Sequence, residues 1–312
     1  MALSARLSRR RLLYLAASLP VGALLAACGA DEDEAPAPEP TPTATPEPPF
    51  VVAAGEEKRL LMPGTPYETP LYVFGSGLAG PVLMVLGGVH GNVPGGWLAA
   101  ERLQERLRPA TGAFLIVPRA NKLAVAEFVR TTPELGDLNR LYPGQADGPP
   151  MAQMARQIFE TLREFRVSLL LDLHESWAFY KDRTATQTGT AYLGQTIASS
   201  TSQGIELARG VAEAVNQRIR APQEELIPRE WPPRGFALSV ATPGASTAPE
   251  PGTTGPTAAF GGGRSSLGLS SQVPGLIAIL VEMGQQQPLE RRIALHVDVV
   301  EEAARRIGLV SV

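Results

Sequence analysis

The chain has 312 residues, of which 44% are hydrophobic, 19% charged and 6% aromatic, with 31 glycines and 29 prolines. Its length allows one sizeable core or two small ones, because domains usually contain about 100 to 200 residues. A formal net charge of -3 excludes a general affinity for nucleic acid through net charge. The single cysteine excludes an internal disulfide and a thiolate-rich metal cluster.

Residues 1–27 have the pattern of an export signal. Arginines 9 to 11 precede an apolar run, Leu12–Ala27, which is too short for a membrane-spanning helix of about 20 residues. The consecutive arginines resemble a twin-arginine signal, and Leu25–Cys28 resembles a bacterial lipobox, in which the cysteine becomes the lipidated N-terminus. We therefore expect an extracytoplasmic protein, anchored to a membrane by lipid on Cys28. The alternative is a small residue buried in an anchor helix.

Residues 28–49 are rich in Pro, Thr, Ala, Asp and Glu, with almost nothing apolar to bury. Prolines favour an extended, semi-rigid chain, so this composition predicts a disordered tether between the anchor and the folded part. Residues 50–312 are then predicted to form the folded domain.

Strand and helix patterns alternate in this domain. Apolar runs predict buried strands at Val82–Leu86, Ala113–Val117, Val167–Leu171 and Leu276–Val281. Amphipathic spacing predicts helices at Pro94–Leu107, Met151–Phe165, Gln203–Ile219 and Leu289–Ile307. This order predicts an α/β fold with a largely parallel central sheet flanked by helices. The stretch 242–263, rich in Pro, Gly, Thr and Ala, is predicted to be a long irregular loop.

Polar side chains follow three of the predicted strands. His90 comes after the first, His174 after the third and Glu282 after the fourth. Ligand sites of open parallel sheets lie beyond the carboxyl ends of the strands, so we expect these side chains to converge. Two imidazoles and a carboxylate are the parts of a metal-hydrolase site. The alternative is that each histidine is a satisfied strand-end residue and Glu282 a surface carboxylate.

Four motifs occur in a characteristic order: Gly88–Asn92, Arg130 with Asp137–Arg140, Asp172–His174 and Val281–Gly284. Together they resemble the succinylglutamate desuccinylase/aspartoacylase family of the zinc carboxypeptidase clan. The resemblance implies a zinc carboxypeptidase-like fold with a mixed sheet, one zinc ion, and hydrolysis of an amide next to a free carboxylate.

The resemblance also assigns roles to residues. His90 and His174 match the two histidine ligands of the zinc ion. Glu282 matches the general base and acid, which takes a proton from the attacking water. Arg130 matches the arginine that polarises the scissile carbonyl and stabilises the developing oxyanion.

Asn139 and Arg140 match the pair that binds the substrate carboxylate. Their chemistry agrees, because an arginine fork fits a carboxylate bidentately and a neighbouring amide adds a directional donor. The alternative is a turn with a solvated arginine. Asp172 lies two residues before His174, on the same side of an ideal strand, where it either orients the imidazole or bonds to backbone.

One departure from the family pattern affects the metal site. The first family motif is His-x-x-Glu, whose glutamate is the third protein ligand, and this chain has Val93 there. Catalytic zinc sites normally use three protein ligands and water. Glu175 is the nearest replacement by sequence, although in an ideal strand it points away from the face of His174. Asp182 is more remote.

Three hypotheses follow. The first is an extracytoplasmic metal-dependent hydrolase, either a carboxypeptidase or an N-acyl amino acid deacylase. The second is a family member that binds peptides or N-acyl amino acids without cleaving them. The third is an unrelated, non-catalytic cell-surface lipoprotein.

The remaining candidates are aromatic residues and the third histidine. His296 falls on the last predicted helix, where we expect a surface position. Trp177, Phe179 and Tyr180 either line the substrate pocket or pack in the core. Trp231 is expected to anchor its loop, with a recognition role as the alternative.

Overall fold

The computed structural model describes residues 50–132, 134–184, 186, 189–232 and 264–310. Residues Pro48–Val312 form one compact unit. The predicted signal with Cys28, the tether and the loop 242–263 lie outside the described residues. Within the described part, no helix combines the length and the apolar character needed to cross a membrane.

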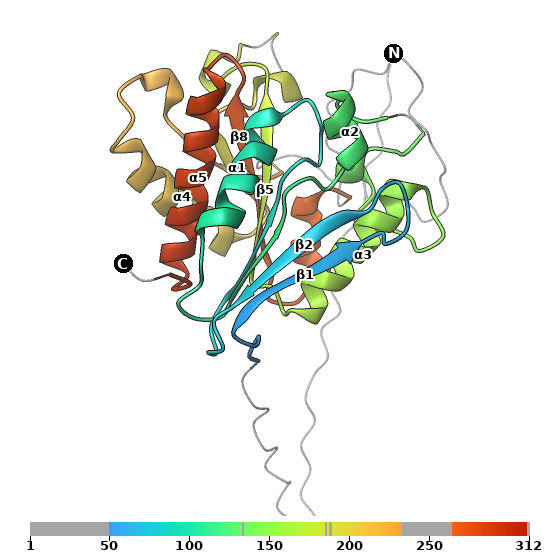
Figure 1. The fold of residues 1–312 in the computed structure, drawn as a ribbon. Coiled ribbons are helices and arrows are strands. Elements are labelled where there is room, and N and C mark those ends of the chain that lie inside the picture. The colour runs from blue at the N-terminus through green and yellow to red at the C-terminus, as the bar shows by residue number, and fades with distance from the viewer. Residues whose placement is uncertain (1–49, 133, 185, 187–188, 233–263, 311–312) are drawn as a thin grey trace, which may run out of the picture. The chain divides into compact units, whose positions relative to one another are not determined.

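Eight strands of the described chain form one sheet, in the order β1-β2-β4-β3-β5-β8-β6-β7 (Figure 1). The strands are β1 (Gly55–Leu61), β2 (Thr69–Gly75), β3 (Val82–Leu86), β4 (Ala113–Val117), β5 (Leu169–Ser176), β6 (Thr196–Ser199), β7 (Ile227–Glu230) and β8 (Ile277–Gly284). The central strands β4, β3, β5 and β8 are mutually parallel. On their flanks, β2 runs antiparallel to β4 and β6 antiparallel to β8. The predicted mixed, largely parallel sheet is confirmed.

Helices cover both faces of the sheet. The five α-helices of the described chain are α1 (Pro94–Arg106), α2 (Lys122–Glu127), α3 (Pro150–Glu164), α4 (Ser202–Asn216) and α5 (Leu289–Arg306). Helices α1, α4 and α5 lie together on one side of the sheet, and α3 lies on the other (Figure 1). Alternate residues of a strand point to opposite faces. Accordingly, Leu83 and Val85 of β3 pack in the core under α1, α4 and α5, while Met84 and Leu86 pack in the core under α3.

The eight elements predicted from the sequence are present, but two strands run further than their apolar runs. Strand β5 continues to Ser176 and β8 to Gly284. His174 and Glu282 therefore lie within paired strands rather than after them, because the cross-strand pairing continues past the apolar residues. Strands β1, β2, β6 and β7 and helix α2 were not predicted.

Candidate active site

The two central strands place a histidine and a glutamate side by side. His174 of β5 pairs in register with Glu282 of β8, so both side chains share one face of the sheet. The side chains are almost fully buried, with 2% and 7% of their residue surface exposed. The hydroxyl of Ser176 donates a hydrogen bond of 2.8 Å to Glu282 Oε2. Burial raises the pKa of Glu282, and the charge of His174 opposes that rise.

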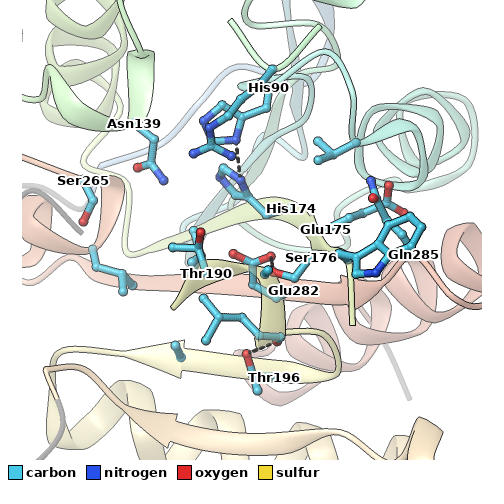
Figure 2. A pocket seen from close by; sticks show the side chains of 18 of the residues that line it. His90, Asn139, His174, Glu175, Ser176, Thr190, Thr196, Ser265, Glu282 and Gln285 are labelled. Atoms are coloured by element: carbon cyan, nitrogen blue, oxygen red, sulfur yellow. Dashed lines mark hydrogen bonds between the residues drawn. The ribbon is translucent and has the colours of Figure 1, made fainter. Parts of the chain in front are cut away.

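His90 reaches the same place from the loop after β3. Its Nδ1 lies 3.1 Å from Nδ1 of His174 (Figure 2). On the far side of each ring stands a carboxylate. Asp137 Oδ1 is 3.0 Å from His90 Nε2, and Asp172 Oδ2 is 3.0 Å from His174 Nε2. A carboxylate at Nε2 favours a proton on that nitrogen, so Nδ1 is the ring atom through which each histidine would bind a metal ion.

The two imidazoles differ in their electrostatics. Burial lowers the pKa of His90 to about 4, although the hydrogen bond with Asp137 opposes the change. Burial alone would also lower the pKa of His174, but the charges of Asp172 and Glu282 raise it above its ordinary value.

The glycines around His90 allow its loop to pack closely. A Cβ atom on Gly91 would lie 1.8 Å from the carbonyl oxygen of Ala124 in α2, and Gly88 has a φ of +65°. The indole of Trp97 donates to the carbonyl of Gly91 at 3.2 Å. These glycines therefore allow the backbone of the loop to lie close to α2 and the β4–α2 connection, and this packing fixes the position of His90.

The carboxylate of Asp137 organises the predicted substrate-binding segment. It caps a short 3₁₀ helix, Leu138–Arg140, by accepting the backbone N–H of Asn139 at 3.0 Å. Its second oxygen lies 3.3 Å from Nη2 of Arg130. Burial alone would raise the pKa of Asp137, but the hydrogen bond with His90 and the charge of Arg130 hold that pKa well below its usual range.

The side chain of Asn139 is fixed as well. Its Oδ1 accepts the backbone N–H of Ser266 at 2.9 Å, so its amide nitrogen remains for other partners. Arg140 donates from Nη1 to the Asn139 carbonyl at 2.7 Å. Burial lowers the pKa of Arg140, and the charge of Asp137 opposes that shift.

A cavity of about 220 Å³ lies at this end of the sheet. All six predicted catalytic, substrate-binding and metal residues of the described chain line it: His90, Arg130, Asn139, Arg140, His174 and Glu282. Figure 2 shows Asn139 and Ser265 on one side, the two histidines above, and Glu282 and Thr196 below. Trp177 and Trp231 also line the cavity, and Trp177 is 64% exposed. The structure therefore favours the pocket-lining role for Trp177.

The residues present fit a metal ion at two protein positions. Two nitrogens bound to one tetrahedral zinc at about 2.0 to 2.1 Å would be about 3.4 Å apart, close to the 3.1 Å between the Nδ1 atoms. Imidazoles backed by carboxylates are also the usual arrangement of histidine ligands. The described residues offer no third protein ligand, since no group of three His, Cys, Asp or Glu among them is placed to hold a metal.

Neither suggested replacement ligand supplies the third position. Glu175 points to the opposite face of the sheet, as strand geometry predicted, and its Oε1 lies 2.7 Å from Nη1 of Arg292 in α5. The same oxygen lies against Gly95 in the first turn of α1. Asp182 is exposed. Val93, buried to 3% exposure, lines the cavity at the position of the family glutamate.

The structure corrects one expectation and adds residues that the sequence did not indicate. His296 is fully buried, so the predicted surface position is wrong. Helix α5 packs against α1 and α4 as well as β8, which covers more than one of its faces. Asp137 had been recognised only as part of a motif, and the role of Ser176 depends on the length of β5. Arg229 was missed because the four-residue strand β7 was not predicted.

The mixed α/β sheet, with His174 and Glu282 near the carboxyl ends of its central strands, has a carboxypeptidase-like fold. Residues 79–181 match the family described as the succinylglutamate desuccinylase/aspartoacylase catalytic domain. This match confirms the resemblance shown by the motifs. It includes the predicted residues from His90 to His174, whereas Glu282 lies beyond it. The family is one of amide hydrolases that typically depend on zinc.

Individual proteins are similar to parts of the chain. The chain is 36% identical to N-alpha-acetyl-L-2,4-diaminobutyric acid deacetylase of Halomonas elongata over 98 residues. This aligned segment covers 30% of this chain and 28% of the deacetylase. Helicobacter pylori Csd4, a D,L-carboxypeptidase solved in its mDAP-bound form, has a TM-score of 0.58 at 18% identity over 74% of this chain and 52% of Csd4. An aspartoacylase family protein from Mesorhizobium loti has a TM-score of 0.53 at 20% identity, over 85% of this chain and 69% of that protein. The chain thus spans about half of Csd4 and less of the deacetylase.

Proposed function

We propose that this chain is a hydrolase that cleaves an amide next to a free carboxylate, acting on an N-acyl amino acid or the C-terminal residue of a peptide. The observation that carries the proposal is the pairing of His174 with Glu282 on adjacent strands, with His90 Nδ1 3.1 Å from His174 Nδ1, inside one cavity. The names of the deacetylase and the D,L-carboxypeptidase support the same reaction class.

In this reaction each residue of the site has its own role. A divalent metal held by His90 and His174 would polarise the scissile carbonyl and activate water. Glu282, whose pKa is raised by burial, accepts a proton from the attacking water and passes it to the leaving amine. Arg130 supplies positive charge to the developing oxyanion. Asn139 and Arg140 bind the free carboxylate and so set the position of the amide.

A second candidate function follows from the missing third ligand. A chain with Val93 at the ligand position and Glu175 committed to Arg292 holds zinc weakly, since catalytic sites normally use three protein ligands. In that case the cavity binds peptides or N-acyl amino acids through Asn139 and Arg140 without cleaving them.

Metal content, turnover and binding separate the two candidates. We would purify the full chain without chelator, measure zinc, assay release of amine from N-acyl amino acids and short peptides, and measure their binding by calorimetry. Near-stoichiometric zinc that is lost in His90→Ala, together with turnover, supports the hydrolase. Binding with neither zinc nor turnover, even after zinc is added, supports the binding protein, and absence of binding contradicts both.

The substitution Glu282→Gln tests the assigned base. It removes the proton acceptor but keeps the size of the side chain, so we expect turnover to fall by about 10²-fold or more while ligand affinity stays near that of the wild type. Glu206→Gln, which changes an exposed carboxylate of α4, is the matched control. Hydrolysis at the wild-type rate in Glu282→Gln would show that the base is wrongly assigned.

We also propose that the protein works outside the cytoplasm as a lipid-anchored protein. The support is the sequence of residues 1–28, with its basic start, apolar run and Leu-Ala-Ala-Cys end. Expression in a bacterium with a radiolabelled fatty acid tests this, since Cys28→Ala should abolish labelling and release the protein from the membrane fraction.

A further inference from the structure

The cavity continues past the catalytic pair, on the side away from the carboxylate-binding residues. In Figure 2, Asn139 lies on one side of His174 and Glu282, and Gln285 lies on the other side; all four line the cavity. In the proposed reaction the free carboxylate binds at Asn139 and the scissile amide lies at the catalytic pair. The acyl part of the substrate therefore extends towards Gln285.

Trp177 stands at this acyl end of the cavity. Strand β5 pairs with β8 as far as Ser176 and Gly284, and the N–H of Gln285 donates to the Ser176 carbonyl at 2.8 Å. Trp177, the next residue after Ser176, therefore lies beside Gln285. Val93 lines the same cavity and adds a second apolar side chain. The acyl end thus combines an indole, an isopropyl group and an amide.

The indole of Trp177 is exposed on a backbone that is held on both sides. Before it, the Ser176 carbonyl accepts from Gln285; after it, the Ala178 N–H donates to the Ala191 carbonyl at 2.8 Å and the Ala178 carbonyl accepts from Gly194 at 3.0 Å. A ligand that covers an exposed indole removes apolar surface from water, and a fixed backbone lowers the entropy lost on binding.

The amide of Gln285 presents a hydrogen-bond acceptor beside this indole. Its Nε2 donates to the carbonyl of Asn92 at 2.9 Å, which ties the loop of His90 to the end of β8. No donor among the described residues is bound to Oε1 of Gln285. This oxygen can therefore accept an N–H of a ligand.

The length of the acyl end favours a peptide over a small acyl group. Counted along β5, the Cα of Trp177 lies about 10 Å beyond that of His174, because a strand rises about 3.3 Å per residue. An acetyl group extends only about 1.5 Å past the scissile carbonyl carbon. A peptidyl group extends about 3.5 Å further with each residue, and it carries the N–H that an acetyl group lacks.

We propose that Trp177 and Gln285 form a subsite for a peptidyl group, so that the substrate is the C-terminal part of a peptide rather than an N-acetyl amino acid. The inference rests on the proposed function and deepens it by naming the substrate class. The indole packs against the chain that precedes the scissile bond, and Oε1 of Gln285 accepts the N–H of the residue before that bond.

Two pairs of ligands test the subsite. Their binding is measured by calorimetry on the full chain carrying Glu282→Gln, so that the ligand is not consumed. We expect N-acetylalanylalanine to bind about tenfold or more tightly than N-acetylalanine, since it alone reaches the indole. N-acetylglycylalanine and N-(4-oxopentanoyl)alanine differ only by replacement of one N–H with CH₂, and we expect the first to bind about threefold or more tightly.

Variants in the same background identify the residues responsible. Trp177→Ala should abolish the advantage of N-acetylalanylalanine and leave the affinity for N-acetylalanine unchanged, whereas Trp177→Phe should retain part of the advantage. Gln285→Leu should abolish the difference within the second pair. The control is Phe128→Ala, which removes another exposed aromatic side chain, one that does not line the cavity.

The outcomes distinguish this inference from the proposed function. Equal affinity for N-acetylalanine and N-acetylalanylalanine, or an advantage that survives in Trp177→Ala, would overturn the subsite while binding of the carboxylate stands. Equal affinity within the second pair, or a difference that survives in Gln285→Leu, would overturn the role of Gln285. If none of the four ligands binds, the proposed function fails and this inference fails with it.

Discussion

His296 makes the stability of this protein sensitive to acid. The imidazole is fully buried on α5. Burial lowers its pKa from 6.5 to about 3. In the unfolded chain His296 therefore becomes protonated near pH 6.5, whereas in the folded protein it stays neutral down to about pH 3. The free energy of unfolding is therefore unaffected by this group above pH 6.5 and decreases as the pH falls from 6.5 towards 3.

The size of this loss follows from the two pKa values. A pH of 5 lies about 1.5 units below the pKa of His296 in the unfolded state, whereas His296 in the folded state is still neutral at that pH. The free energy of unfolding is therefore about 2 kcal/mol lower at pH 5 than at pH 7. The substitution His296→Leu removes the titrating group and fills the site with a side chain of similar volume. At pH 7 we expect it to change the free energy of unfolding by no more than about 1.5 kcal/mol, because the side chain is replaced by an apolar one of similar volume.

Urea unfolding at pH 7 and pH 5, followed by circular dichroism, measures both effects. Other groups, His90 among them, also cost stability in acid, so the informative quantity is the difference between wild type and variant. We expect the wild type to lose about 2 kcal/mol more than His296→Leu over this interval. Equal losses in the two proteins would refute the reasoning, because His296 would then titrate alike when folded and unfolded.

Three further substitutions test the architecture of the site. Val93→Glu places a carboxylate at the third ligand position of the family and should tighten zinc binding in a chelator competition; unchanged affinity would contradict the placement of residue 93. Arg292→Met leaves the buried carboxylate of Glu175 unpaired and should lower the free energy of unfolding by about 3 to 5 kcal/mol, measured in urea. Gly91→Ala forces a Cβ against the Ala124 carbonyl and should cost about 1 to 3 kcal/mol in the same assay; an unaffected protein would show that the loop can move.

The strands that the sequence predicted contain continuous apolar runs. Val82–Leu86 and Ala113–Val117 are continuous apolar runs, and they match β3 and β4 residue for residue. Two of the missed strands, β1 and β7, carry no such pattern. Residues 55–61 of the edge strand β1 are mostly exposed and rich in charge, and β7 holds proline, arginine and glutamate in four residues. Such strands form because a neighbouring strand offers a free edge, which is a tertiary effect that local composition does not record.

The site was predicted where the chemistry depends on residue type and missed where it depends on packing. His90, His174 and Glu282 stand out as polar residues at the ends of buried strands, and the structure brings them together. The burial of His296 could not be predicted without knowing that α5 also packs on α1 and α4. The position of Arg229 needed the register of two short strands.

The position of β8 in the sheet has a consequence for how the protein is made. This strand, the last of those described along the chain, lies between β5 and β6. Until it is synthesised, β5 has an open edge and β6 with β7 has no central partner, so the sheet remains in two parts. Pairings of this kind, between residues more than 100 positions apart in sequence, form slowly because a long loop must close first. A growing chain that already contains His90, His174 and Asn139 still lacks Glu282, and the pocket closes only when its last strand inserts.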